Sequence, residues 1–152
     1  METVLTEIES AIKRLGLPSS AIRVLPEEDG RSVYLDALNH FVASGDRRRW
    51  WEDFRQESTS YEFPGDDGWL QIPKLVPDPD EKVWFIVEED ALPFYPVYET
   101  SPRVACDIIG NCYAYEYYLV HKLKQWLLCE THHGVIYAVG KGIQERLHGI
   151  MA

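Results

Sequence analysis

Residues 129–133, with the sequence Cys-Glu-Thr-His-His, form the sharpest group of side chains that could do chemistry. A Cys-x-x-His spacing lets a thiolate and an imidazole reach one metal ion, but a structural zinc site needs four ligands and usually combines two such half-sites. The sequence holds no second half-site, so the one four-ligand set it offers is Cys106, Cys112, Cys129 and His132. The simpler interpretation has Cys129 packed as a small apolar strand residue and both histidines in a hairpin turn. We therefore expect neither a metal nor another cofactor.

The same group also offers side chains for catalysis. A cysteine becomes a nucleophile when a histidine lies within reach, and three histidines could be brought to Cys129 by the fold: His121, His132 and His133. No nucleophile-elbow glycine pattern surrounds this cysteine. A small hydrolase or ligand-binding domain is therefore the alternative function, with a site at the end of the sheet built from Glu116, Cys129, Glu130, His132 and His133.

Glu116 and Glu130 are carboxylates within otherwise apolar strands, where burial raises a pKa and each group needs a partner. The turn at residues 121–124 joins their strands, and Glu116 lies five residues before it while Glu130 lies six residues after it. That one-residue difference leaves open whether the two side chains share a face. They act either as an acid–base pair or as structural groups bonded to tyrosine hydroxyls or to histidine.

Other common chemistries lack their motifs. The sequence contains no Gly-x-Gly-x-x-Gly after a strand, no phosphate-binding loop with Gly-Lys-Ser/Thr, and no His-Glu-x-x-His. Nucleotide-dependent, metalloprotease and kinase activities are therefore not expected.

The elements that position these side chains centre on residues 113–139, which read as three strands separated by turns at 121–124 and 131–134. The side chains that point to either face of this meander are apolar, so other elements must shield both faces from water. Strands at 82–88 and 94–98, with a helix opened by Ser101 and Pro102, precede it. The fold class is α+β, with an antiparallel sheet of about five strands, covered on one face by that helix and on the other by N-terminal helices.

The N-terminal part is predicted to be mainly helical. We expect helices at 3–15, from Ser32 to Gly45 and at 47–57 capped by Asp46, with a short strand at 21–25. Residues 57–82 are expected to form a long, irregular insertion within the domain, with extended pieces at 61–63 and 69–72. Residues 140–148 are expected to form a short helix or an irregular tail. The whole chain, 1–152, is interpreted as a single domain.

Charge separates the chain into unlike parts. The net charge is −10, and residues 57–90 hold ten acidic and two basic residues. Such a field disfavours nucleic acid and anionic membranes and speeds encounter with a basic protein. The three arginines at 47–49 either form ion pairs with these acidic residues or face a partner. The residues expected to contact a basic partner are Asp66, Asp67, Trp69, Asp78, Asp80 and Glu81.

Three cysteines, an odd number, and the absence of a signal peptide indicate a reducing cytoplasm. No apolar run reaches the roughly 18 residues that a membrane helix needs.

Three motifs carry a resemblance: Glu116-Tyr117-Tyr118, the run WLLCE at 126–130, and His132-His133. They resemble elements of a family of small bacterial proteins of unknown function, and the strand at 83–86 fits the same pattern. The resemblance implies no catalytic role. The layout of helices followed by an antiparallel sheet in an acidic protein is also loosely similar to the SUKH immunity superfamily, whose members neutralise toxins by binding them.

These observations favour a non-enzymatic protein-binding module, such as an immunity or inhibitor protein, that recognises a basic partner through an acidic surface. A self-associating subunit is a third interpretation, which requires an exposed edge on the aromatic strands. The sequence does not set the oligomeric state.

Overall fold

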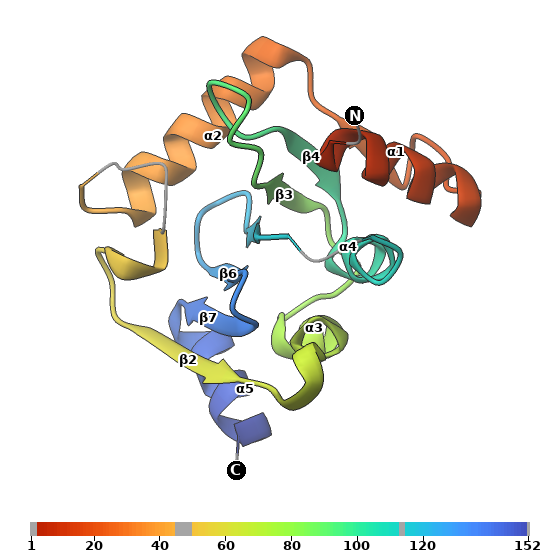
Figure 1. Ribbon diagram of the computed structural model, residues 1–152. Coiled ribbons are helices and arrows are strands. Elements are labelled where there is room, and N and C mark those ends of the chain that lie inside the picture. The colour runs from red at the N-terminus through yellow and green to blue at the C-terminus, as the bar shows by residue number, and fades with distance from the viewer. Residues whose placement is uncertain (1–2, 45–49, 113–114, 152) are drawn as a thin grey trace.

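A computed structural model describes residues 3–44, 50–112 and 115–151 (Figure 1). The helices are α1 (Val4–Leu15), α2 (Glu27–Phe41), α3 (Ile72–Leu75), α4 (Pro102–Ile109) and α5 (Lys141–Met151), with 3-10 turns η1 (Trp50–Glu52), η2 (Pro64–Asp66) and η3 (Gly68–Gln71). The strands are β1 (Ile22–Val24), β2 (Ser58–Glu62), β3 (Val83–Val87), β4 (Val97–Thr100), β5 (Tyr117–Val120), β6 (Leu127–Glu130) and β7 (Val135–Val139). They form one antiparallel sheet, so the predicted α+β class is confirmed.

The sheet has seven strands in the order β1-β4-β3-β5-β6-β7-β2, with each neighbouring pair antiparallel. The predicted meander is confirmed as β5-β6-β7. The predicted sheet of about five strands left out both edge strands. The short strand predicted at 21–25 is edge strand β1, which pairs with β4, and β2 is a short polar strand (STSYE) that pairs with β7. Because β1 and β2 form the two edges, the aromatic strands lie inside the sheet and have no exposed edge.

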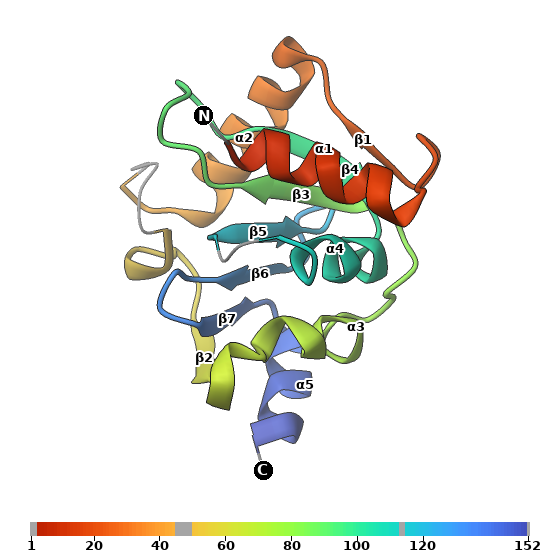
Figure 2. The same ribbon diagram turned by 45° about the vertical axis from the view of Figure 1, so that its right-hand side comes forward.

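Helices cover both faces of the sheet (Figure 2). This cover is needed because the side chains that point to either face of the meander strands are apolar. One core lies under α1, α3, α4 and α5 and contains Phe85, Tyr117 and Leu128. The other lies under α2 and contains Ile86 and Tyr118.

The prediction that all N-terminal helices share the face opposite α4 was wrong. Ile8 and Ala11 of α1 belong to the α4-side core, whereas α2 and the chain around Trp50 pack on the other face. Edge strand β1 lies between α1 and α2 in the chain, so the chain passes the rim of the sheet there and its two flanking helices pack on opposite faces.

Capping side chains define the helices that the sequence predicted best. At α1, Thr3 Oγ1 accepts a hydrogen bond from the Thr6 N–H at 3.2 Å, and Gly16 ends the helix with a φ of 65°. At α4, Ser101 Oγ accepts from the Val104 N–H at 3.2 Å, and Pro102 opens the helix. These two helices are confirmed because the signals that bound them are local.

Helix α2 begins and ends earlier than predicted. It starts at Glu27 directly after Pro26, so Glu27, Glu28 and Asp29 form its first turn, where carboxylates interact favourably with the helix dipole. It ends at Phe41 rather than at Gly45. Gly45 lies outside the described residues.

The helix predicted at 47–57 is not formed in its described part. Asp46 and the arginines at 47–49 lie outside the described residues, and Trp50–Glu52 make only a single 3-10 turn. The chain then pairs back on the end of α2, since the Arg55 N–H donates to the Phe41 carbonyl at 2.8 Å and Val42 bridges Phe54. Trp50 is fully buried and stacks on Tyr118 with ring centroids 4.2 Å apart, which outweighs the helical periodicity.

Two smaller predictions change, and for residues 140–148 the helical alternative is confirmed. Residues 69–72 are not extended, because η3 runs into α3 and buries Ile72 and Leu75 three residues apart on one helical face. Strand β4 begins at Val97, after Pro96, which has no N–H for the ladder. Residues after Gly140 form a regular helix, α5. None of the helices described is long and apolar enough to cross a membrane.

Gly140, between β7 and α5, offers a test of this packing. Its φ is +113°, and an added Cβ would lie 2.6 Å from the Gln125 carbonyl oxygen. We expect Gly140→Ala to lower the free energy of unfolding by about 2–3 kcal/mol in urea denaturation, because both strain and overlap act there. Gly142→Ala is the control: nothing lies within 4 Å of that Cβ, so it should be neutral or stabilise by up to about 1 kcal/mol. Equal losses in both variants would contradict the described junction.

Candidate functional site

The predicted site residues meet at one end of the sheet, but on two different faces. Tyr117 of β5 pairs with Glu130 of β6, so Glu116 is one position out of register with Glu130. Side chains alternate along a strand, and Tyr118, two residues from Glu116, belongs to the α2-side core. Leu128, two residues from Glu130, belongs to the α4-side core. The sheet therefore separates the two carboxylates, and they cannot act as one acid–base pair.

On the α4 side, Glu130 is buried and accepts a hydrogen bond from the Tyr117 hydroxyl at 2.8 Å. Burial raises the pKa of Tyr117 well above its usual value, and the Glu130 charge and this hydrogen bond add to the rise. The phenol therefore stays a donor at all physiological pH values and holds the carboxylate in place.

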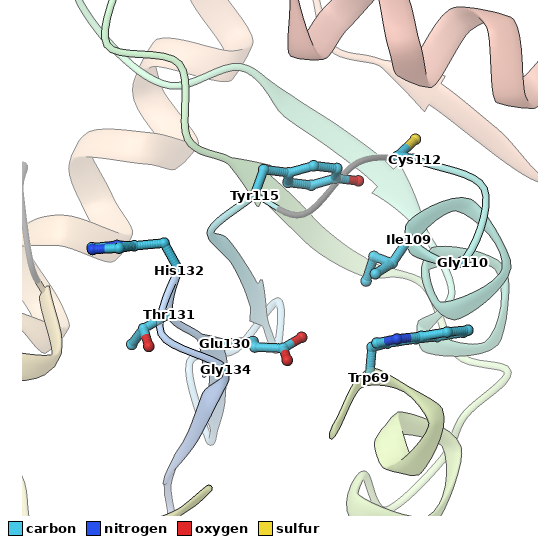
Figure 3. Close-up of a pocket in the computed structure, with 9 residues that line it drawn as sticks. All are labelled: Trp69, Ile109, Gly110, Cys112, Tyr115, Glu130, Thr131, His132 and Gly134. Atoms are coloured by element: carbon cyan, nitrogen blue, oxygen red, sulfur yellow. The ribbon is translucent and has the colours of Figure 1, made fainter. Parts of the chain in front are cut away.

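A cavity of about 210 Å³ lies between the β6–β7 turn and the end of α4 (Figure 3). In Figure 3 the Glu130 carboxylate points into this space, the Trp69 side chain lies across from it, and the His132 ring points away. The residues that line the cavity are Trp69, Ile109, Gly110, Cys112, Tyr115, Glu130, Thr131, His132 and Gly134.

Trp69 is held as a fixed wall of this pocket. The Cys106 thiol donates to the Trp69 carbonyl at 3.3 Å, and the indole lies so close to Gly110 that an added Cβ there would be 2.8 Å from two ring atoms. Tyr115 and Cys112 form the neighbouring wall, where burial raises the pKa of both the phenol and the thiol. Both groups are therefore neutral near pH 7.

On the α2 side, Glu116 is 1% exposed and bonds to two partners that the sequence had suggested, a histidine and a tyrosine. His132 contacts its Oε1 through both the backbone N–H, at 3.2 Å, and Nδ1. The Tyr118 hydroxyl lies 3.5 Å from its other oxygen. This arrangement agrees with the structural interpretation of Glu116.

Glu88, at the end of β3, is the member of this cluster that the sequence analysis missed. Burial raises its pKa to about 7, and the Glu116 charge, a hydrogen bond with Glu116 and the Asp90 charge add to the rise, while His132 opposes it. The Glu88 N–H also donates to the Glu116 carbonyl at 3.0 Å. Glu88 lies two residues after Ile86, so the alternation along the strand points its side chain to the α2 face. That it meets Glu116 follows only from the pairing of β3 with β5.

Cys129 occupies a less reactive position than nucleophilic catalysis requires. Cys129 is fully buried on the α2 side, and burial raises the pKa of its thiol well above the usual value, so it carries no thiolate at neutral pH. His132 and His133 lie in the β6–β7 turn with ring centroids 3.9 Å apart. Across the described ranges, no three His, Cys, Asp or Glu side chains are placed to hold a metal ion.

The residues predicted to contact a basic partner do not all lie free at the surface. Asp67 and Asp78 are exposed. Asp80 is also exposed but pairs with Arg103, whose Nε lies 2.8 Å from Oδ1.

The other three predicted contact residues differ from one another. Glu81 is half-buried and lies 3.7 Å from Nε2 of His121. Trp69 is half-buried as the wall of the pocket. The side chain of Asp66 lies outside what the structure describes.

Comparison with known proteins gives the family. Residues 2–151 match the sequence model of a family of unknown function, DUF6756. The chain belongs to this family. This agrees with the resemblance of the C-terminal half to a family of unknown function and extends it over nearly the whole chain. A search of the curated proteins and one of the solved structures found no match. The likeness to the SUKH superfamily stays a prediction.

The pKa of Glu88 predicts how stability varies with pH. The folded state holds this proton more tightly than the unfolded chain, so stability falls as pH rises from about 4.5 to about 7. Glu88→Gln removes that loss. We expect the variant to exceed the wild type by about 1–2 kcal/mol at pH 8, allowing for the partial exposure of Glu88, and to match it near pH 4.5.

Urea denaturation at both pH values measures this difference. The control is Glu145→Gln, an exposed residue of α5, which should track the wild type at each pH. A Glu88→Gln variant with no advantage at pH 8 would show that Glu88 does not share a buried carboxyl site.

Proposed function

We propose that this chain is a non-enzymatic protein-binding module that recognises a basic partner through an acidic surface. The observation that carries this proposal is the charge of residues 57–90, with ten acidic and two basic residues in a chain of net charge −10. Charge of one sign concentrated in one segment steers oppositely charged partners and raises association rates.

The exposure of these acids supports the proposal. The carboxylates of Glu57, Glu62, Asp67 and Asp78 belong to exposed residues at the two ends of β2, directly before η3 and in the loop before β3. Within the described ranges, no Lys, Arg or His forms a salt bridge with any of these four. Unneutralised surface carboxylates keep their full field available to a partner, whereas the field of Asp80 is partly neutralised by Arg103.

A more specific form of the function is an immunity or inhibitor protein that acts in the cytoplasm. The loose SUKH likeness and the inactive chemistry around Cys129 both favour binding over catalysis. The partner would then be a basic protein whose activity is blocked by the bound chain.

Neutralising the exposed acids tests the proposal. The variant Glu62→Gln/Asp67→Asn/Asp78→Asn should fold normally, because none of the three residues is buried. Tagged wild type should retain a basic protein in stoichiometric amount from extracts of the source organism at low salt and release it at high salt. We expect the triple variant to associate with that protein about tenfold more slowly.

The matched control removes the same charge elsewhere: Glu9→Gln/Asp107→Asn/Glu145→Gln, three exposed residues of α1, α4 and α5. This control should retain the same protein almost as well as the wild type. If the two triples lose it equally, total charge alone governs association and the acidic segment is not a recognition surface. If the wild type retains no basic protein, the proposal fails.

A further inference from the structure

The pocket beside Glu130 has the size of a receptor for one side chain. Its volume of about 210 Å³ is below the roughly 300–1,000 Å³ of sites that take drug-sized ligands. It opens between the β6–β7 turn and the C-terminal end of α4, and is built from segments that are distant in the chain. A group that enters it must therefore be small, or be the end of a longer chain.

The polar chemistry of the pocket selects a cation. Glu130 is the one acidic residue among the nine described lining residues, and none of the nine is Lys or Arg. The Tyr117 hydroxyl bonds one carboxylate oxygen at 2.8 Å. A carboxylate has about four acceptor positions, so several donors can share it. A carboxylate held in a confined space bonds a charged donor more strongly than a neutral one.

The wall of the pocket selects a flat cation. The Trp69 indole is fixed against Gly110, and the Tyr115 ring forms the adjoining side. A guanidinium group stacks on such a face and at the same time presents paired N–H donors to a carboxylate, whereas an ammonium acts as a point charge.

We propose that this pocket receives an arginine side chain of the basic partner, with the guanidinium stacked on Trp69 and bonded to Glu130. This inference rests on the proposed function and names its anchoring contact. Asp67 is exposed and lies two residues before Trp69 in the chain, so its charge adds to the field that attracts a cation. The acidic segment thus sets the encounter, and the pocket sets the chemical identity of the residue that is held.

The probe is N-acetyl-arginine amide, with N-acetyl-citrulline amide as its neutral counterpart of the same shape. Binding is followed by the ¹H–¹⁵N shifts of the Trp69 indole N–H and the Gly110 and Gly134 amides. We expect saturable shifts with the arginine probe at millimolar concentration and at least tenfold weaker binding of the citrulline probe.

Two variants and one control locate the binding. Glu130→Gln keeps the acceptor for Tyr117 but removes the charge, and Ile109→Phe fills the pocket from its half-buried rim without changing charge. Each should weaken arginine binding at least tenfold, while Glu145→Gln, with the same change of net charge, should bind like the wild type. Amide spectra of the free variants show that each is folded.

The outcomes separate this inference from the proposed function. Shifts spread over exposed acids, reduced as much by Glu145→Gln as by Glu130→Gln, would overturn the pocket, and so would equal binding of both probes. Retention of the basic protein by Glu130→Gln and Ile109→Phe at wild-type strength would overturn the pocket and leave the acidic surface standing. Loss of that protein only in the acidic triple variant would likewise overturn the pocket alone.

Discussion

The structure depends on a sheet whose central strands are buried on both faces. Every residue of β5 and β6 is buried, so a polar side chain there has no access to bulk water and must find its partner within the protein. Tyr117 supplies that partner for Glu130 on one face, and His132 with Tyr118 supplies it for Glu116 on the other. The aromatic residues of the meander therefore serve as core and as hydrogen-bond donors together.

Two carboxylate sites follow from this constraint, and they differ in character. On the α2 face, half-buried Glu88 meets buried Glu116, and desolvation together with repulsion from Glu116 raises the pKa of Glu88 to about 7. On the α4 face, Glu130 stands in a small cavity with an aromatic wall, which suits the recognition of a cation. The same β6–β7 turn serves both, since His132 extends to one face and Thr131 and Gly134 line the pocket on the other.

Local signals account for what the sequence could predict. Thr3 and Gly16 bound α1, Ser101 and Pro102 open α4, and turn residues separate β5, β6 and β7, so each element was recognisable from a few neighbours. The spacing of apolar residues at 47–57 predicted a helix that does not form from Trp50 onward. The stacking of buried Trp50 on Tyr118 sets the backbone conformation there instead.

Long-range register accounts for most of what the sequence could not predict. The faces of Glu116 and Glu130 depend on a pairing that a shift of one residue would reverse. Glu88 and Trp69 are distant in sequence from the residues they meet, and one chain alone carries no signal of those contacts. The sequence showed that acidic residues cluster in one segment, but it did not show that Asp80 forms a salt bridge with Arg103.

The separation of the two carboxylates by the sheet is the central claim, and nuclear Overhauser contacts of the glutamate methylene protons test it most directly. We expect contacts from Glu116 to the rings of His132 and Tyr118, and from Glu130 to the ring of Tyr117. A one-residue slip of β5 against β6 would place both side chains on one face. Contacts from Glu116 and Glu130 to the same aromatic ring would contradict the account.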